Sequence, residues 1–519
     1  MQSTVDFRKC WAVIMAIIML PRLAPGETTN ATPAAARYHC AGGLVLTGNS
    51  NLVTLNKALA LHSAAAVEEL ALSRLSGLLA AGMNFGSNAS AGPLLEPLLT
   101  DLLKAESLGS FGGVSTNALN FVVALKLDSS RVQLWHSNLD RAFGAPGGKY
   151  SAAEFNGWRW RKGASDSFWI VPASGWLVVR RGDQFLPLQT EYVQQVKRQG
   201  RPAPPLQTNW LEVDLDWTRP DAFMPDWARL LKPARLKISV AAEQDNLRLT
   251  ARMIYPEAMP WKSDALQIPS ELVGSPLVSF TAGQDVAAFL NLSPAFAQLP
   301  GNPLTNQFCA WAMDPLPFLT YMAWPQADAA NVLEELSTEA SSAFSPALKQ
   351  FNGTELRWLP NQRKLVLANL HVILPTLQVV QGVAADYLML GLFPPPPADK
   401  PIPDDLSKQI NGRTNLVYYD WELTGSRLQH WQMLGLMLLS PSREPTDYVM
   451  DARRLEDNWL RGLEPIAGNT VTEITRTAPN ELTLVRNAPL GLTGIEMFLL
   501  ADWLSAAGSQ AINSRPPPP

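Results

Sequence analysis

The sequence predicts an α+β protein built from two related lobes, each a mainly antiparallel sheet with helices packed on one face. Three observations lead to this prediction. Strand-like apolar runs outnumber the strict strand–helix alternation that a parallel sheet requires. A stretch of eleven residues occurs twice, with the two copies 206 residues apart. Each copy is followed by two further strand-like runs that resemble a closing hairpin.

The repeat is carried by residues 208–218 (TNWLEVDLDWT) and 414–424 (TNLVYYDWELT), which share four identical positions. In this alignment Asp216 meets Glu422. A second match joins the pattern WxRxLxP at 227–233 to the same pattern at 459–465, where the offset has grown to 232. The difference of 26 residues predicts an insertion in the second copy, and the helix-like stretch 426–439 accounts for most of it.

The first lobe is expected to span residues 38–256. Its apolar periodicities predict strands at 38–46, 119–127, 158–161, 168–171, 176–180, 210–216, 234–240 and 246–254. They predict helices at 52–61, 64–81, 93–104, 130–143 and 184–198.

A proline-rich linker at 257–276 leads to the second lobe, which is expected to span 277–506. The predicted strands are 277–281, 307–312, 318–323, 356–359, 364–368, 387–392, 415–422, 470–475 and 481–486. The predicted helices are 327–344, 426–439 and 491–506. The tail at 507–519 ends in four prolines and is expected to be disordered.

The first 26 residues have the parts of a secretory signal peptide. Arg8 and Lys9 precede ten uninterrupted apolar residues at 11–20, and small residues at 24–26 follow. Ten apolar residues are too short to span a bilayer. We therefore expect cleavage near Gly26, a flexible start at 27–37, no permanent membrane span, and a periplasmic or secreted location. An uncleaved anchor is the alternative.

Composition narrows the function classes further. The formal net charge is −4, which disfavours a nucleic-acid partner because such proteins carry basic patches. After Cys10 in the signal only Cys40 and Cys309 remain, and they are either buried thiols or a disulfide. Cysteine and histidine spacing predicts no metal site and no cofactor, and neither GxSxG nor HExxH occurs.

One segment is suggestive of chemistry. Glu212, Asp214 and Asp216 alternate with apolar residues, so a strand would place all three carboxylates on one face. Asp420 and Glu422 take the matching positions in the second copy. We interpret this face as a polar surface that meets water. Calcium binding and acid–base catalysis of glycoside hydrolysis are the alternatives.

A second alternation concerns Trp158 and Trp160, which are interleaved with Arg159 and Arg161. Such interleaving can stack on bases or sugars. A strand with its tryptophans in the core and its arginines on the opposite face also explains it, and this is the interpretation that we favour.

The signal, the tandem units and the segment NLVYYDWELTG at 415–425 give a chain that resembles exported bacterial proteins of unknown function. The resemblance implies no catalytic residues. We expect a non-catalytic binding or scaffolding module whose partner is an unknown envelope protein or ligand. A hydrolase that uses the acidic strands and a carrier of an apolar ligand are the alternatives.

Overall fold

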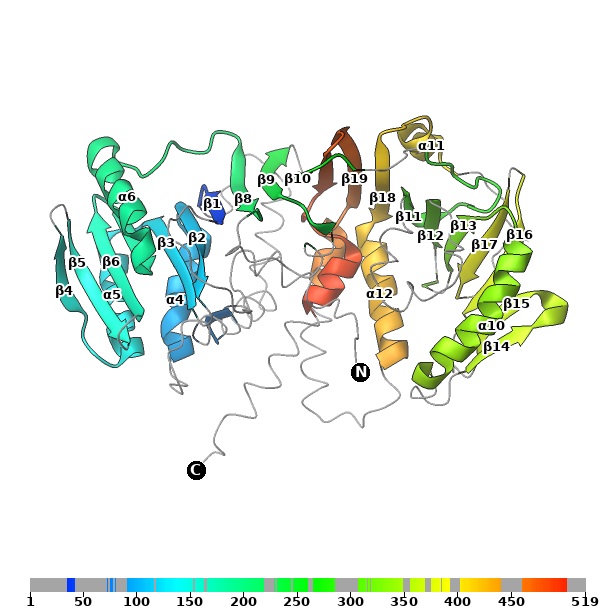
Figure 1. Ribbon diagram of the computed structural model, residues 1–519, viewed down its shortest axis with the longest axis horizontal. Helices are drawn as coiled ribbons and strands as arrows, with labels where there is room; N and C mark the ends of the chain where they lie inside the picture. Colours follow the sequence, from blue (N-terminus) through cyan, green and yellow to red (C-terminus); the bar gives the residue numbers. More distant parts are fainter. Residues whose placement is uncertain are drawn as a thin grey trace, which may run out of the picture. The chain divides into compact units, whose positions relative to one another are not determined.

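The computed structural model describes two compact units, shown in Figure 1. Unit 1 contains the described residues up to Glu257, and unit 2 contains those of 258–439 and 464–498; the short stretches 460–463 and 499–501 are grouped with unit 1. The described residues are 35–42, 72, 75–77, 80, 91–115, 118–152, 155–162, 166–218, 228, 231–243, 246–259, 265–284, 307–314, 316–317, 319–348, 355–368, 375–383, 385–392, 402–439 and 460–501. The predicted signal peptide, the tail at 507–519 and the helix at 52–61 lie outside them.

The described residues of unit 1 form ten antiparallel strands. Hydrogen bonding places them in the order β4-β5-β6-β7-β3-β2-β1-β8-β9-β10. Their bounds are β1 Ala36–Cys40, β2 Ser107–Ser115, β3 Ala118–Lys126, β4 Gly148–Ala152, β5 Phe155–Lys162, β6 Asp166–Ala173, β7 Trp176–Arg181, β8 Asn209–Asp216, β9 Arg235–Glu243 and β10 Asn246–Ile254.

Helices cover both faces of this sheet, so the expectation of helices on one face is wrong for unit 1. Trp135 and Leu139 of α5 (Ser129–Phe143) pack with Phe121 and Val123 of β3. Val193 of α6 (Leu186–Gln199) instead packs in the cluster that contains Val122 and Ala124. Alternate residues of a strand point to opposite faces, so β3 is buried on both sides. A strand buried on both faces reads as a continuous apolar run, which hides the second helical layer from sequence patterns.

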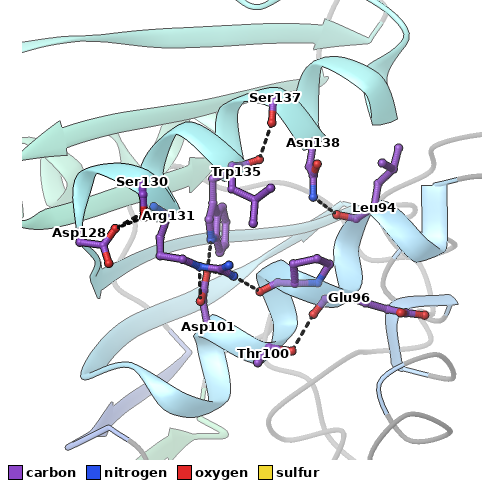
Figure 2. A network of polar contacts seen from close by, with 12 residues as sticks. Leu94, Glu96, Thr100, Asp101, Asp128, Ser130, Arg131, Trp135, Ser137 and Asn138 are labelled. Carbon is purple, nitrogen blue, oxygen red and sulfur yellow. Dashed lines mark hydrogen bonds and ion pairs between the residues drawn. The ribbon is translucent and has the colours of Figure 1, made fainter.

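The helix α4 (Ala91–Lys104) is joined to α5 by a polar network, shown in Figure 2. The buried carboxylate of Asp101 accepts from Arg131 Nε at 2.9 and 3.1 Å and from Trp135 Nε1 at 2.8 Å. Asn138 Nδ2 donates to the carbonyl of Leu94 at 2.9 Å. Every partner in this network lies on one of the two helices or at the N-cap of α5, so it fixes how α4 and α5 pack.

In unit 2 the part of the chain that the structure describes also forms ten antiparallel strands. Hydrogen bonding places them in the order β14-β15-β16-β17-β13-β12-β11-β18-β19-β20. Adding ten to each strand number of unit 1 gives this same order. The bounds are β11 Leu277–Gln284, β12 Gln307–Met313, β13 Thr320–Pro325, β14 Glu355–Leu359, β15 Lys364–Ala368, β16 Thr376–Gln381, β17 Asp386–Gly391, β18 Leu416–Leu423, β19 Asn469–Ala478 and β20 Glu481–Ala488.

Helices flank the sheet of unit 2 on both faces as well. Helix α10 (Ala329–Leu348) packs in the cluster that contains Trp324 of β13 and Leu388 of β17. Helix α11 (Asp404–Ile410) packs on the opposite face, with Tyr321 and Met389. Helix α12 (Thr424–Leu439) follows β18 directly and covers the stretch 426–439, where a helix was predicted. The positions of α5, α6, α10 and α11 between strands therefore agree in the two units.

Most predicted elements are present, with ends shifted by a few residues. Strand β1 begins at Ala36 rather than residue 38, so the flexible start cannot extend to residue 37. Three strands were not predicted: β2, β4 and β16. Strand β2 reads SLGSFGGVS, and its three glycines conceal the strand pattern. One of them, Gly109, lies so close to the ring of Tyr38 that a Cβ atom there would sit 2.5 Å from Cε1.

Candidate functional site

A cleft of about 460 Å³ lies over the face of unit 1 that carries the acidic strand β8. Its floor is a row of charged residues in register across four strands. Arg37 of β1 faces Asp214 of β8, Asp214 faces Lys237 of β9, and Lys237 faces Arg252 of β10. Glu212, the neighbouring acid on the same face of β8, also lines the cleft. The sequence pattern identified the acids but not the three cations, because these lie on other strands and join the acids only through strand register.

The two acids of the cleft are already bound by residues of the chain. Both oxygens of Asp214 accept hydrogen bonds from the guanidinium of Arg235, of which the Nε bond is 2.6 Å long. Glu212 Oε1 accepts from Asn209 Nδ2 at 2.6 Å. Asp216 lies at the end of the strand and accepts from the hydroxyl of Thr218 at 2.6 Å. These acids are partly exposed or exposed, as the interpretation of a wet polar face requires.

The cations Arg37 and Lys237 differ from the acids in their bonding. Within the described part of the chain, neither pairs with a carboxylate at salt-bridge distance. Each therefore presents a charge to the cleft that a ligand can neutralise.

The wall of the cleft includes two partly or fully buried rings. Tyr192 of α6 lies 3.4 Å from Ser110 of β2 through its hydroxyl, and burial raises the pKa of this phenol. His39 of β1 has a lowered pKa, chiefly because burial disfavours its charged form. Its Nε2 atom is buried and has no hydrogen-bond partner among the described residues. The imidazole is therefore a neutral group with an unused nitrogen at the edge of the cleft.

Asp420 and Glu422, the acids of unit 2, have a different environment. Asp420 accepts from Thr281 Oγ1 at 2.6 Å, and its neighbour in register on β19 is Thr472, which accepts from Arg486 Nε at 2.9 Å. Glu422 has an exposed fraction of only 5 %. The interpretation of a face that meets water is therefore wrong for this strand.

Burial shifts the pKa of both acids in unit 2. Desolvation raises the pKa of Asp420, and the hydrogen bond from Thr281 and the charges of Arg486 and Arg427 oppose the rise. Desolvation, with a further contribution from the charge of Asp420, raises the pKa of Glu422 to about 7. The backbone N–H of Gly494, which donates to Glu422 Oε1 at 2.6 Å, opposes that rise.

Helix α12 contributes Arg427 to this polar cluster. Arg427 of α12 has an exposed fraction of 8 %, and its guanidinium carbon lies 4.7 Å from the centre of the Trp431 ring. A Cβ atom on Gly494 would lie 2.8 Å from the backbone nitrogen of Leu428, so only glycine permits this approach to the helix. Arg486 completes the cluster by donating to Glu496 at 2.6 Å.

The structure relates positions of the two units by an offset that is one residue larger than the offset of the sequence alignment. The sequence alignment pairs Asp214 with Asp420. However, Asp214 lies on the α6 face of its sheet, whereas Asp420 lies on the face of α10, opposite α11. The register shifts in the two strands occur between Asn209 and Leu211 and between Leu416 and Tyr418, an offset of 207. With this offset Val213 corresponds to Asp420, and Leu215 to Glu422.

The remaining chemistry-bearing groups carry no site that we can define. Cys40 and Cys309 are buried free thiols, and burial raises the pKa of each, that of Cys309 to about 12. Among the described residues there is no cluster of three or more acids, histidines and cysteines that could hold a metal ion. No helix in the described ranges is both long and apolar enough to cross a membrane. Neither a family model, nor a curated protein, nor a solved structure matches this chain.

Proposed function

We propose that this chain is an exported, non-catalytic binding protein whose binding surface is the charged cleft of unit 1. The observation that carries the proposal is the row Arg37, Asp214, Lys237 and Arg252 on the floor of a cleft of about 460 Å³. Two cations of this row are without a carboxylate partner in the described residues. A polar ligand, or a protein segment that carries an acidic group, fits such a surface.

The two requirements of the hydrolase alternative are met in different places. Acid–base catalysis needs carboxylates in a cleft with pKa values raised toward neutrality. The acids in the cleft are bound to Arg235 and Asn209, whereas the acids with raised pKa values, Asp420 and Glu422, lie in unit 2 outside the cleft. This separation favours binding over catalysis.

The carrier alternative requires an apolar cavity. The floor of the cleft is charged, and the apolar clusters of the sheets are filled by side chains from α5, α6, α10 and α11. This lining favours a polar ligand instead.

We further infer that the two units arose by duplication of one ancestral α+β lobe. Ten strands in the same order, with helices between corresponding strands, support this inference. After duplication, the charged face stayed open in one lobe and was replaced by an apolar core in the other. Export and membership of the exported bacterial proteins that the chain resembles remain part of this proposal.

The test of binding is a pull-down of the tagged mature protein from its native envelope fraction, with captured proteins and small molecules quantified by mass spectrometry. The variant is Arg37→Glu with Lys237→Glu, which reverses both unpaired charges. The matched control is Lys408→Glu, a change of the same sign at an exposed position of α11 in unit 2.

We expect the double variant to lose about tenfold or more of the captured partner, since two charge contacts become repulsive. The control should capture as much as wild type, and all three proteins should unfold at the same urea concentration. Equal capture by all three, or no specific capture by wild type, would contradict the proposal. N-terminal sequencing of the exported protein tests the location, and we expect it to begin near Glu27.

A further inference from the structure

Unit 1 contains a second charged cluster, on the part of its sheet formed by β5, β6 and β7. Arg159 of β5 faces Trp169 of β6, and Trp169 faces Arg180 of β7. Residues that are in register across antiparallel strands share a face, so the three side chains form one row. The guanidinium carbon of Arg180 lies 3.5 Å from the centre of the Trp169 ring, and that of Arg159 lies 5.0 Å from it. Both contacts are short enough for cation–π attraction.

Packing holds the row in place. Arg180 and Trp169 have exposed fractions of 1 % and 2 %, and Gln189 of α6 is fully buried beside them. Arg180 Nε donates to Gln189 Oε1 at 2.8 Å, and Arg180 Nη1 donates to the carbonyl of Gly182 at 2.7 Å. Arg159 Nη2 donates to the hydroxyl of Ser167 at 2.9 Å. The side chains are thus positioned before any ligand arrives.

Three donors of this cluster have no acceptor. They are Arg159 Nε, Trp169 Nε1 and Gln189 Nε2, each buried and without a hydrogen-bond partner among the described residues. Buried N–H groups in folded proteins are nearly always hydrogen bonded. All the unused atoms here are donors, so the group that the cluster lacks is an acceptor.

The charge of the cluster indicates which kind of acceptor. Two guanidinium groups face one carboxylate, that of Asp183, which is 3.4 Å from Arg180 Nη1 and has a side chain that is 80 % exposed. An exposed carboxylate screened by water neutralises a buried cation poorly. The cluster also lies at the start of α6, which follows the turn Asp183–Phe185 without a side-chain N-cap. The partial positive charge of a helix N-terminus adds to that of the arginines.

We propose that Arg159, Trp169, Arg180 and Gln189 form a binding site for a small oxyanion, a phosphate or carboxylate group. Guanidinium N–H groups match the planar or tetrahedral oxygens of such a group, and the indole and amide donors supply further hydrogen bonds. The binding site stands on observations separate from the cleft and does not depend on the proposed function. Asp183 lies at its exposed side and repels the anion.

The test is isothermal titration of the mature full-length protein with inorganic phosphate and with acetate, at constant ionic strength set with chloride. A thermal melt at each ligand concentration gives a second readout, because a ligand that binds only the folded state raises the melting temperature. We expect saturable binding of phosphate or acetate by wild type.

Four variants make the test specific. Arg159→Gln removes one charge and one unused donor and should weaken binding about tenfold or more. Arg159→Lys keeps the charge but lacks the Nε donor, and it should also bind more weakly than wild type. Asp183→Asn should bind about two- to fivefold more tightly, since it removes the repelling charge. Arg161→Gln changes the same charge two residues along the same strand, at an exposed position, and should bind as wild type does.

Two results would overturn the proposal. Absence of saturable binding by wild type overturns the proposal and indicates that water satisfies the three donors. Equal weakening by Arg159→Gln and Arg161→Gln overturns it as well, because it indicates diffuse surface attraction. If Arg159→Gln fails to fold by circular dichroism, Arg159→Lys and Asp183→Asn decide, because they must shift affinity in opposite directions.

Discussion

Units 1 and 2 have the same strand order and opposite distributions of polarity. On the α6 face of unit 1, the row Arg37, Asp214, Lys237 and Arg252 is charged and open to a cleft. At the corresponding place in unit 2, on the α11 face, the row is Phe280, Trp421, Val471 and Asn487, of which the first three pack in the apolar core.

On the opposite face of each sheet the polarity is reversed. Tyr38, Val213, Ile238 and Ala251 form an apolar row in unit 1. The corresponding row in unit 2 is Thr281, Asp420, Thr472 and Arg486.

Strand pairing and the polarity of a sheet face are therefore set independently. The order of strands depends on hydrogen bonds that every residue can make. The polarity of a face depends on what covers it, and a shift of one residue moves each side chain of a strand to the other face. Unit 2 accommodates acids on a covered face because Arg427, Arg486, threonine hydroxyls and the N–H of Gly494 contact or neighbour them.

The largest loss of stability is expected when an acid of unit 2 is introduced at the corresponding apolar position of unit 1. Leu215 corresponds to Glu422 and lies in an apolar cluster with Leu236 and Trp217. Leu215→Glu should therefore destabilise the protein by at least about 5 kcal/mol, since a buried carboxylate there gains no partner. Urea unfolding followed by tryptophan fluorescence measures this, with Leu215→Met as control. A loss below about 1 kcal/mol would show that the two positions do not differ as described.

A similar loss is expected where unit 1 does bury an acid. Asp101→Ala removes the carboxylate that binds Arg131 and Trp135 between α4 and α5. Breaking such a buried pair costs about 3 to 5 kcal/mol, because the remaining groups lose their partner. Urea unfolding of Asp101→Ala beside Asp183→Ala, an exposed acid of the same unit, measures the difference. Equal stability of the two variants would contradict a structural role for the network.

The acids of unit 2 should make stability depend on pH. Glu422 has a pKa of about 7 in the folded protein against 4.5 for a free carboxyl, so the folded state holds a proton that the unfolded state has released. Stability from this group is therefore complete below about pH 4.5 and declines as the pH rises through 7, by about 3 kcal/mol in all.

The free energy of unfolding at pH 5 and pH 8 checks this. Glu422→Gln should abolish most of the difference, whereas Glu212→Gln in unit 1 should leave it unchanged. Stability that rises between pH 5 and pH 8 in wild type, and in the same measure in Glu422→Gln, would exclude Glu422 as the cause.

The smallest effect is expected from the acid of the open face. The ion pair of Asp214 with Arg235 is partly exposed, with side-chain exposed fractions of 33 % and 45 %. Asp214→Asn should therefore change stability by at most about 0.5 kcal/mol. Asp420→Asn should cost more, because the carboxylate of Asp420 is desolvated and accepts a hydrogen bond from Thr281. Equal losses from the two substitutions would remove the distinction between the faces.

Sequence patterns predicted the positions of helices and strands better than the tertiary contacts around them. The alternation of Trp160 with Arg159 correctly separated a core face from an arginine face. The helix-like stretch 426–439 is a helix in the structure, as predicted. The repeated segment correctly located β8 and β18. The alignment used an offset of 206 because Asp214 and Asp420 are identical, whereas the register shifts of the strands give an offset of 207.

What sequence patterns missed lies in contacts between distant segments. Arg427 and Gly494 cover Glu422 from parts of the chain that no local periodicity connects with β18. The same holds for Lys237 and Arg252, which join the cleft only through the register of β9 and β10. The glycines of β2 concealed its strand pattern. The second helical layer, formed by α6, was not predicted because the strands beneath it are apolar on both faces.

Glu212 of unit 1 is exposed and Asp214 is partly exposed, whereas Glu422 of unit 2 is buried and the carboxylate of Asp420 is desolvated. Carbodiimide labelling of carboxylates in the native mature protein, located by mass spectrometry, tests this difference directly. We predict rapid labelling of Glu212 and slow or no labelling of Asp420 and Glu422, with all three labelled alike in urea. Labelling of Asp420 and Glu422 at the rate of Glu212 in the native protein would contradict the account.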